Sequence, residues 1–113
     1  MRPTLSVPAL AGTLALTACA GTLDVATSSA TTTYQCESGI LIKAGYPDTD
    51  HARVEYQGST YELTIAISAS GARYVGGGVE WWTKGSGPGS TASLFVHLDD
   101  GSSGAVIENC AAR

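Results

Sequence analysis

Residues 68–85 read SASGARYVGGGVEWWTKG, and this stretch has the pattern of a β-hairpin with a polar loop before it. Two short runs of β-forming residues, 73–75 and 79–83, lie on either side of three consecutive glycines at 76–78. Because glycine adopts positive φ at little cost, the three glycines are suited to a turn between two strands. The sequence therefore predicts a strand, a turn and a second strand here.

Both ends of the predicted hairpin place polar side chains beside a glycine. Ser70 precedes Gly71, and Lys84 precedes Gly85, fourteen positions further along the chain than Ser70. Closing the hairpin would bring the serine hydroxyl and the lysine ammonium to neighbouring places on the surface. A hydroxyl beside a cation on a rigid sheet suits contact with carboxylates. The simpler interpretation of the same pattern is an ordinary hairpin with a surface lysine.

Apolar and polar residues alternate through much of the remaining chain, which is the period of a half-buried strand. Segments 52–56, 61–67 and 92–98 have this period, and turn-forming residues separate them. With the runs at 34–36, 40–46, 73–75, 79–83 and 105–110, they make about eight short strands. Short connections between successive strands favour an antiparallel meander that closes on itself. We therefore expect an all-β fold, with a small barrel preferred to a sandwich.

The N-terminal residues have the pattern of an export signal. Arg2 precedes an apolar run at 5–16, which is too short to span a membrane. The sequence Leu-Thr-Ala-Cys follows at 16–19 and is similar to the lipobox of bacterial lipoproteins. We expect residues 1–18 to be removed as a signal peptide and Cys19 to receive a lipid anchor. An ordinary signal sequence with a chance cysteine is the alternative.

Small and polar residues predominate between Cys19 and residue 33. We expect 19–33 to act as a flexible tether, with a reach of about 20 Å, between the membrane and a domain at 34–113. Ala20 follows the cysteine where aspartate would retain the protein in the inner membrane of enteric-type bacteria. This rule favours the outer membrane, with the domain facing the periplasm.

Two cysteines remain once Cys19 is assigned to lipid. Cys36 and Cys110 lie near the two ends of the domain, and in an oxidising compartment we expect them to form a disulfide. Closing a loop of about 75 residues stabilises a chain by roughly 4 kcal/mol. These cysteines and two distant histidines lack the spacing of metal ligands, so we expect no metal and no cofactor.

Charge and motif content argue against two classes of function. The net charge is −4, whereas a nucleic-acid-binding domain normally presents a basic face. His51 and His97 lie in different expected strands without a nearby nucleophile, and no Gly-x-Ser-x-Gly elbow is present. We therefore expect neither a nucleic-acid partner nor an enzyme. An acidic domain favours basic protein partners instead.

Four short motifs together resemble the membrane-bound inhibitors of c-type lysozyme, bacterial lipoproteins that protect the cell wall from host lysozymes. The motifs are Tyr-Gln-Cys at 34–36, SASGARY at 68–74, Trp-Thr-Lys-Gly at 82–85 and Asn-Cys at 109–110. The resemblance covers about 34–110 and implies an eight-stranded antiparallel barrel with bridged terminal cysteines. It also implies c-type lysozyme as the protein partner and an inhibitor that performs no chemistry.

The resemblance also implies roles for individual residues. A serine of the first central motif and a lysine of the second enter the lysozyme cleft and contact its catalytic carboxylates, and Ser70 and Lys84 match them here. Six neighbours would support the two loops, namely Gly71, Arg73, Tyr74, Trp82, Thr83 and Gly85. This chain departs from the family in a longer glycine-rich loop at 86–90, which bears on which lysozymes it inhibits.

Two other functions stay open at this level. A barrel could bind a small ligand in a cavity lined by Tyr56, Tyr61 and either Trp81 or Trp82. A barrel with so few short strands should, however, fill its interior with side chains. A purely structural lipoprotein of the cell envelope is the remaining alternative.

Overall fold

The structure is a computed structural model that describes residues 30–113. The signal peptide predicted at 1–18, the lipid-bearing Cys19 and most of the predicted tether lie outside the described residues. Among the residues that are described, no helix is long and apolar enough to cross a membrane.

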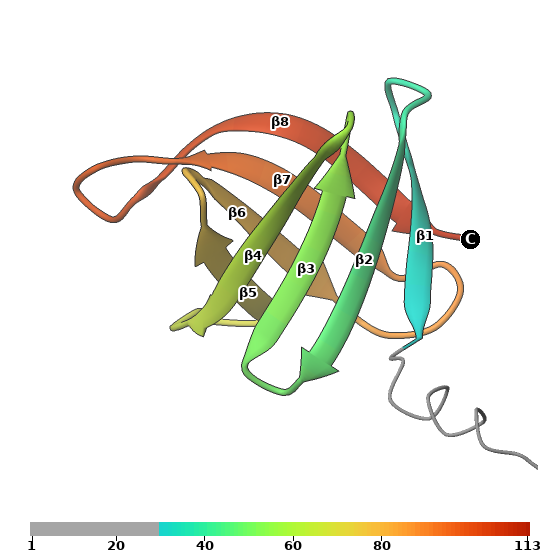
Figure 1. The fold of residues 1–113 in the computed structure, drawn as a ribbon, viewed down its shortest axis with the longest axis horizontal. Helices are drawn as coiled ribbons and strands as arrows, with labels where there is room; N and C mark the ends of the chain where they lie inside the picture. Colours follow the sequence, from blue (N-terminus) through green and yellow to red (C-terminus); the bar gives the residue numbers. More distant parts are fainter. Residues whose placement is uncertain (1–29) are drawn as a thin grey trace, which may run out of the picture.

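Eight antiparallel strands form one closed barrel in which each strand pairs with its neighbours along the chain (Figure 1). The strands are β1 (Thr31–Cys36), β2 (Leu41–Asp48), β3 (His51–Tyr56), β4 (Ser59–Ala66), β5 (Ala72–Gly76), β6 (Val79–Lys84), β7 (Thr91–His97) and β8 (Ser103–Ala112). The expected all-β barrel is therefore confirmed, and the sandwich is excluded. Pairing of β1 with β8 closes the barrel and leaves no open sheet edge.

The first strand begins earlier than the sequence suggested. Residues 31–33, which we assigned to the tether, pair with residues 43–45 of β2 and belong to the barrel. All three are threonine, a residue whose branched Cβ favours extended structure. Their small polar side chains look like linker composition, and this explains the misplaced boundary.

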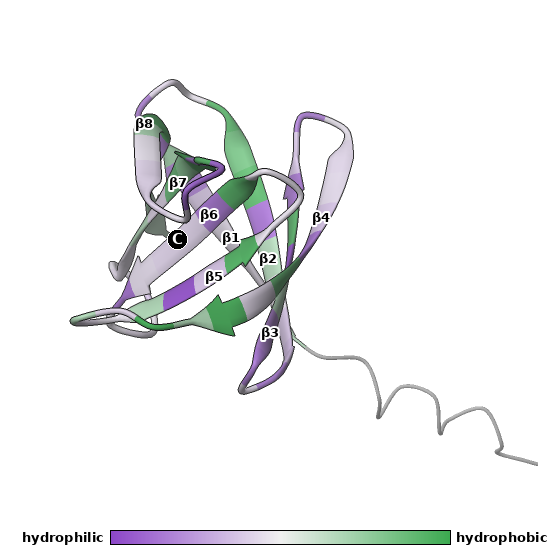
Figure 2. Ribbon diagram, turned by 90° about the vertical axis from the view of Figure 1, so that its left-hand side faces the viewer, coloured by the Kyte–Doolittle hydropathy of each residue, from purple (hydrophilic) through white to green (hydrophobic). Residues whose placement is uncertain are grey.

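The barrel interior is filled by side chains that alternate along the strands. Trp81, Ile42, Leu63 and Leu94 are fully buried, and Figure 2 shows hydrophilic and hydrophobic bands succeeding one another along the strands. Burial of such side chains stabilises the fold by about 1.5–3 kcal/mol each. The interior of the barrel is therefore a packed core.

β7 keeps its period of two, and its register with β6 is regular from Thr91 to Val96. Val96 and Leu98 were expected to continue the apolar face, but they are 36% and 42% exposed. Val96 pairs with Val79, next to the turn at 77–78, and Leu98 follows the last residue of β7, so both lie at the end of the barrel. The register between β7 and β8 is irregular opposite Leu94 to His97, but the extra residues are in β8.

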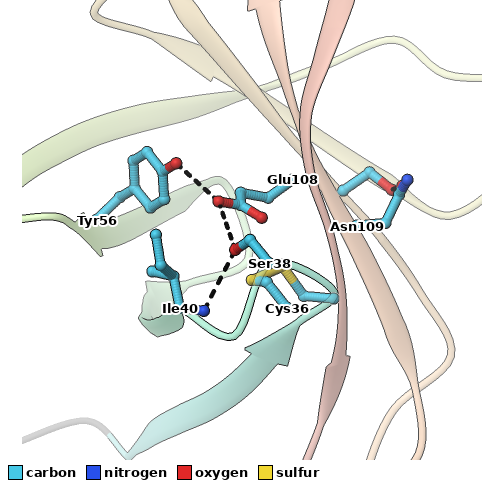
Figure 3. Close-up of a disulfide and its surroundings, with 8 residues drawn as sticks. Cys36, Ser38, Ile40, Tyr56, Glu108 and Asn109 are labelled. Carbon is cyan, nitrogen blue, oxygen red and sulfur yellow. Dashed lines mark hydrogen bonds between the residues drawn. A yellow bond between two sulfur atoms is a disulfide. The ribbon is translucent and has the colours of Figure 1, made fainter.

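The predicted disulfide between Cys36 and Cys110 is present (Figure 3). The two cysteines are register partners, with 3.8 Å between their Cα atoms, and they join β1 to β8 where the barrel closes. Both side chains are buried. The covalent bond therefore holds the seam between the first and last strands.

Candidate functional site

The loop at 68–71 lies directly against the end of β6. Ala72 pairs with Thr83 in the β5–β6 hairpin, so Gly71 lies beside Lys84. A Cβ atom at Gly71 would overlap the Thr83 carbonyl oxygen and lie 3.0 Å from Lys84 Cγ. Gly71 also has a φ of +71°, which side-chain-bearing residues rarely adopt. The backbone next to Ser70 therefore lies against Lys84, and this close approach requires a glycine at position 71.

Gly71→Ala is expected to destabilise the protein by more than the φ penalty alone, which is about 1–2 kcal/mol. The added methyl group must also push the loop away from the Thr83 carbonyl. Gly58→Ala is the matched control, because Gly58 has a φ of +83° but nothing within 4 Å of its Cβ position. Urea unfolding of the two variants measures the difference. Equal losses of stability would contradict the close approach at Gly71.

Trp82 fastens the loop from the outer face of the barrel. Its indole Nε1–H donates a hydrogen bond of 2.8 Å to the Ser70 carbonyl oxygen. Two cations lie over the same ring, Arg73 with its Cζ 5.9 Å from the ring centre and Lys84 with its Nζ at 5.8 Å. Cations at this distance are attracted by the aromatic quadrupole. Trp82 thus holds the Ser70 backbone and stands beside the lysine ammonium.

The side chains of Ser70 and Lys84 are exposed and uncommitted. Among the described residues, neither the serine hydroxyl nor the lysine ammonium has a hydrogen-bond or ion-pair partner. Lysine can donate three hydrogen bonds, and serine can donate one and accept two. A fixed backbone with unused polar groups is suited to binding another molecule.

The glycine-rich loop at 86–90 is held by the last strand. The Gly89 N–H donates to the Ala112 carbonyl, at 2.9 Å, and the Ala112 N–H donates to the Ser90 carbonyl, at 2.8 Å. Gly85 begins the loop with a φ of +82°. Residues 86–90 therefore have a defined backbone path, fixed to β8.

A cavity of about 500 Å³ opens at this end of the barrel, beside the loop at 86–90. Tyr34, Tyr46 and Tyr74 line it, and burial raises the pKa of Tyr46 far above its usual range. Its phenol therefore stays neutral. Thr83 also lines this cavity. Of the six expected supporting residues, Tyr74 and Thr83 thus face the barrel end, while Arg73 and Trp82 contact the Ser70 loop.

The ligand cavity suggested by the sequence does not coincide with this one. Tyr56, Tyr61 and the two tryptophans do not line the cavity at the barrel end. Trp81 is fully buried in the core, and its Nε1–H donates to the Tyr46 hydroxyl. In the part of the chain that is described, no group of three or more metal-ligating side chains is present either.

Sequence reasoning missed a buried carboxylate behind the loop. Glu80 is 0% exposed although it points to the outer side of β6. Arg73 donates to both of its oxygens, from Nε at 2.8 Å and from Nη2 at 3.0 Å. Ser103 Oγ donates to Oε1 at 2.6 Å, and His97 Nδ1 lies 2.7 Å from Oε2. Burial alone would raise the pKa of Glu80, but these hydrogen bonds outweigh burial and lower it to about 2.

The low pKa of Glu80 predicts acid sensitivity. Because the usual value is 4.5, the unfolded chain takes up this proton first as the pH falls. The contribution of Glu80 is complete above pH 4.5 and is lost between there and about pH 2, by about 3 kcal/mol. Unfolding by urea across this range measures it. A Glu80→Gln variant should show a smaller decrease, and an equal decrease would contradict the assignment.

Comparison with known proteins gives two matches. Residues 34–103, more than half of the chain, match the family model described as membrane-bound lysozyme-inhibitor of c-type lysozyme. A protein of Cupriavidus necator named membrane-bound lysozyme inhibitor of C-type lysozyme is 44% identical over 55 residues. That alignment covers 46% of this chain and 44% of the relative, so the chain spans less than half of the relative's length. Both central motifs lie inside the residues matched by the family model.

Proposed function

The chain belongs to the family of membrane-bound inhibitors of c-type lysozyme, and from this premise we propose that it binds a c-type lysozyme and blocks its active-site cleft. The observation that supports this proposal is the exposed pair of Ser70 and Lys84, held together by Gly71 and by the hydrogen bond from Trp82. The family consists of inhibitor proteins and not of enzymes, so the proposed action is binding alone.

The chemistry of the pair fits the chemistry of the proposed target. A c-type lysozyme works with one protonated carboxylic acid and one ionised carboxylate. The Ser70 hydroxyl can accept a hydrogen bond from the acid, and the Lys84 ammonium can pair with the carboxylate. Such a charge-assisted contact strengthens when water is excluded from the cleft. Occupation of the cleft by the two loops would keep the cell-wall polysaccharide out.

The surface charge is also suited to this partner. The chain contains 10 acidic and 6 basic residues. A negative domain is drawn towards a basic protein over distances of about 8 Å at physiological salt, and this raises the rate of encounter. In the proposed complex Lys84 places a positive charge of this domain against a negative charge of the lysozyme, whereas the domain as a whole is negative and the lysozyme basic. This local reversal of the charges favours one orientation of docking.

We further propose that Cys19 carries the lipid that fixes the protein to the outer membrane, with the barrel facing the periplasm. The lipobox-like sequence at 16–19 supports this proposal, as does a family name that places its members at a membrane. Labelled palmitate should enter the wild-type protein in cells and should be absent from a Cys19→Ser variant. Equal labelling of both proteins would contradict the anchor.

Titration of a c-type lysozyme with the purified protein tests the proposed function. Lysis of bacterial cell walls should stop near one inhibitor per lysozyme, and more cell-wall substrate should relieve the inhibition because both compete for the cleft. Absence of inhibition with every c-type lysozyme tried would overturn the proposal. Binding of a small ligand, with the cavity at the barrel end as the candidate site, would then be the next function to test.

A further inference from the structure

Glu80 lies behind the Ser70 loop and contacts side chains of three other strands. Its carboxylate accepts hydrogen bonds from Arg73 of β5 and Ser103 of β8, and it contacts His97 of β7. We propose that Glu80 is the positioning residue of the lysozyme-binding site, because it directs Arg73 and Arg73 holds the loop at 68–71. This inference rests on the proposed function and deepens it.

Arg73 connects the buried carboxylate to the loop backbone. Besides its two bonds to Glu80, its Nη1 donates to the Ile67 carbonyl at 3.1 Å, and its Nη2 donates to the Gly101 carbonyl at 3.2 Å. Ile67 immediately precedes the loop and is 93% exposed, so side-chain packing does little to fix it. The hydrogen bond from Arg73 therefore fixes the point where the chain enters the loop.

The exit of the loop is fixed by a different set of contacts that also involves Arg73. Trp82 donates to the Ser70 carbonyl, and the Arg73 guanidinium lies over the Trp82 ring. A guanidinium group is planar and presents its donors in a rigid fork. Once Nε and Nη2 are directed at Glu80, the plane of the group is set, and with it the direction of Nη1 towards Ile67 and the position of Cζ relative to the Trp82 ring. Both ends of the loop thus depend on the orientation of one arginine.

A purely structural role would not require a carboxylate at this position. Burying an ion pair costs desolvation energy, and a well-packed apolar pair is often equally stable or more so. Glu80 and Arg73 have side chains that are only 0% and 14% exposed, so this cost is substantial here. The ion pair instead fixes the orientation of the Arg73 guanidinium, because a bidentate pair has a specific geometry.

The chain provides a matched control for Glu80. Glu108 is also a buried glutamate, at 6% exposure, and its Oε2 accepts hydrogen bonds from Ser38 Oγ at 3.0 Å and from the Tyr56 hydroxyl at 2.8 Å (Figure 3). Among the described residues, none of these partners contacts the loop at 68–71 or Lys84. Glu108→Gln therefore removes a buried charge from the same barrel without affecting the loop.

The test compares Glu80→Gln with Glu108→Gln in the full chain, under conditions in which circular dichroism shows both to be folded. Two quantities are measured, the hydrogen-exchange rate of the Trp82 indole N–H by NMR and the inhibition constant towards a c-type lysozyme. Glu80→Gln places an amide N–H against the arginine donors, so we expect about tenfold faster exchange and an inhibition constant raised about tenfold. Glu108→Gln should change neither quantity by more than about twofold.

The two readouts separate the positioning role from the proposed function. If the Trp82 indole N–H of folded Glu80→Gln exchanges at the wild-type rate, Glu80 does not position the loop. If exchange is faster but the inhibition constant is unchanged, the position of the loop set by Glu80 does not matter for lysozyme binding, and the inference is overturned. A wild-type protein that inhibits no lysozyme overturns the proposed function, while the exchange measurement still decides whether Glu80 positions the loop. If Glu80→Gln does not fold, Arg73→Lys replaces it, since lysine keeps the charge but cannot reach Glu80, Ile67 and Gly101 together. Arg73→Lys is then expected to show the same faster Trp82 exchange and the same raised inhibition constant. Wild-type values of both quantities would overturn the inference.

Discussion

Lys84→Ala is expected to raise the inhibition constant towards a c-type lysozyme by at least about tenfold while leaving the barrel folded. The ammonium group has no ion-pair partner among residues 30–113, so its binding capacity is available to a carboxylate of the partner. Truncating one member of a desolvated charge pair costs about 2–5 kcal/mol of binding, since the other charge is left unpaired. Lys84 itself is exposed, and only its contact with the Trp82 ring, about 0.5–1 kcal/mol, would be lost from the fold.

Lys43→Ala is the control for this prediction. Lys43 is an exposed lysine on β2, so its removal changes the net charge by the same amount. If lysozyme responds only to overall charge, both variants will have the same effect on the inhibition constant and on its salt dependence. An unchanged constant for Lys84→Ala would keep the proposed function and remove Lys84 from the site. A large effect of Lys84→Ala alone would support direct insertion.

The sequence predicted those parts of the fold that depend on local patterns. Alternating residues identified the strands, and glycine clusters identified the turns, so the number of strands and their antiparallel order followed. The hairpin at 68–85 could be predicted in the same way, because its turn and loop need the positive φ that glycine adopts easily, as Gly71, Gly77 and Gly78 do. Pairing of Cys36 with Cys110 followed from there being two cysteines after the expected lipid site.

Features that depend on contacts between distant segments could not be predicted from the sequence. Glu80 lies between Val79 and Trp81, two core residues, and therefore on the outer face of β6. Its burial arises because Arg73 and the β7–β8 turn cover that part of the outer face. The alternation of residues within β6 cannot indicate that other segments cover part of its outer face. A charged residue inside an otherwise apolar run, Val-Glu-Trp-Trp, was the available signal.

The β7–β8 irregularity had the same origin. The segment 92–98 has a regular period of two, and nothing in it indicates that the register shifts after Leu94. The extra residues are in β8, and the turn at 98–102 has its own hydrogen bonds, from Ser102 to Asp100. His97 reaches Glu80 because it lies on the same face of β7 as Phe95, the register partner of Glu80. The hydrogen-bond network around Glu80 therefore depends on contacts between distant segments, whereas the positions of Ser70 and Lys84 could be predicted from the local sequence.

Removing the disulfide between Cys36 and Cys110 is expected to lower the free energy of unfolding by about 4 kcal/mol, the largest effect on stability that a change at one site should have here. The bond spans 74 positions, and cross-linking a loop of that length restricts the unfolded chain strongly. It also lies at the seam where three register pairs join β1 to β8. Small domains have about 5–15 kcal/mol in total, so the loss should bring the protein close to unfolding at body temperature.

Urea unfolding of a Cys36→Ala/Cys110→Ala variant, with and without reductant, measures this contribution. The oxidised wild type should be the more stable protein, and reductant should lower its stability towards that of the variant while leaving the variant unchanged. The loop at 68–71 lies outside the seam, so the folded fraction of the variant should still inhibit lysozyme with an unchanged constant. A loss below about 1 kcal/mol would show that β1 and β8 hold the seam without the covalent bond. A variant that stays folded but no longer inhibits would instead mean that closure of the barrel sets the geometry of the two loops, and that the contacts of Gly71 and Trp82 are insufficient by themselves.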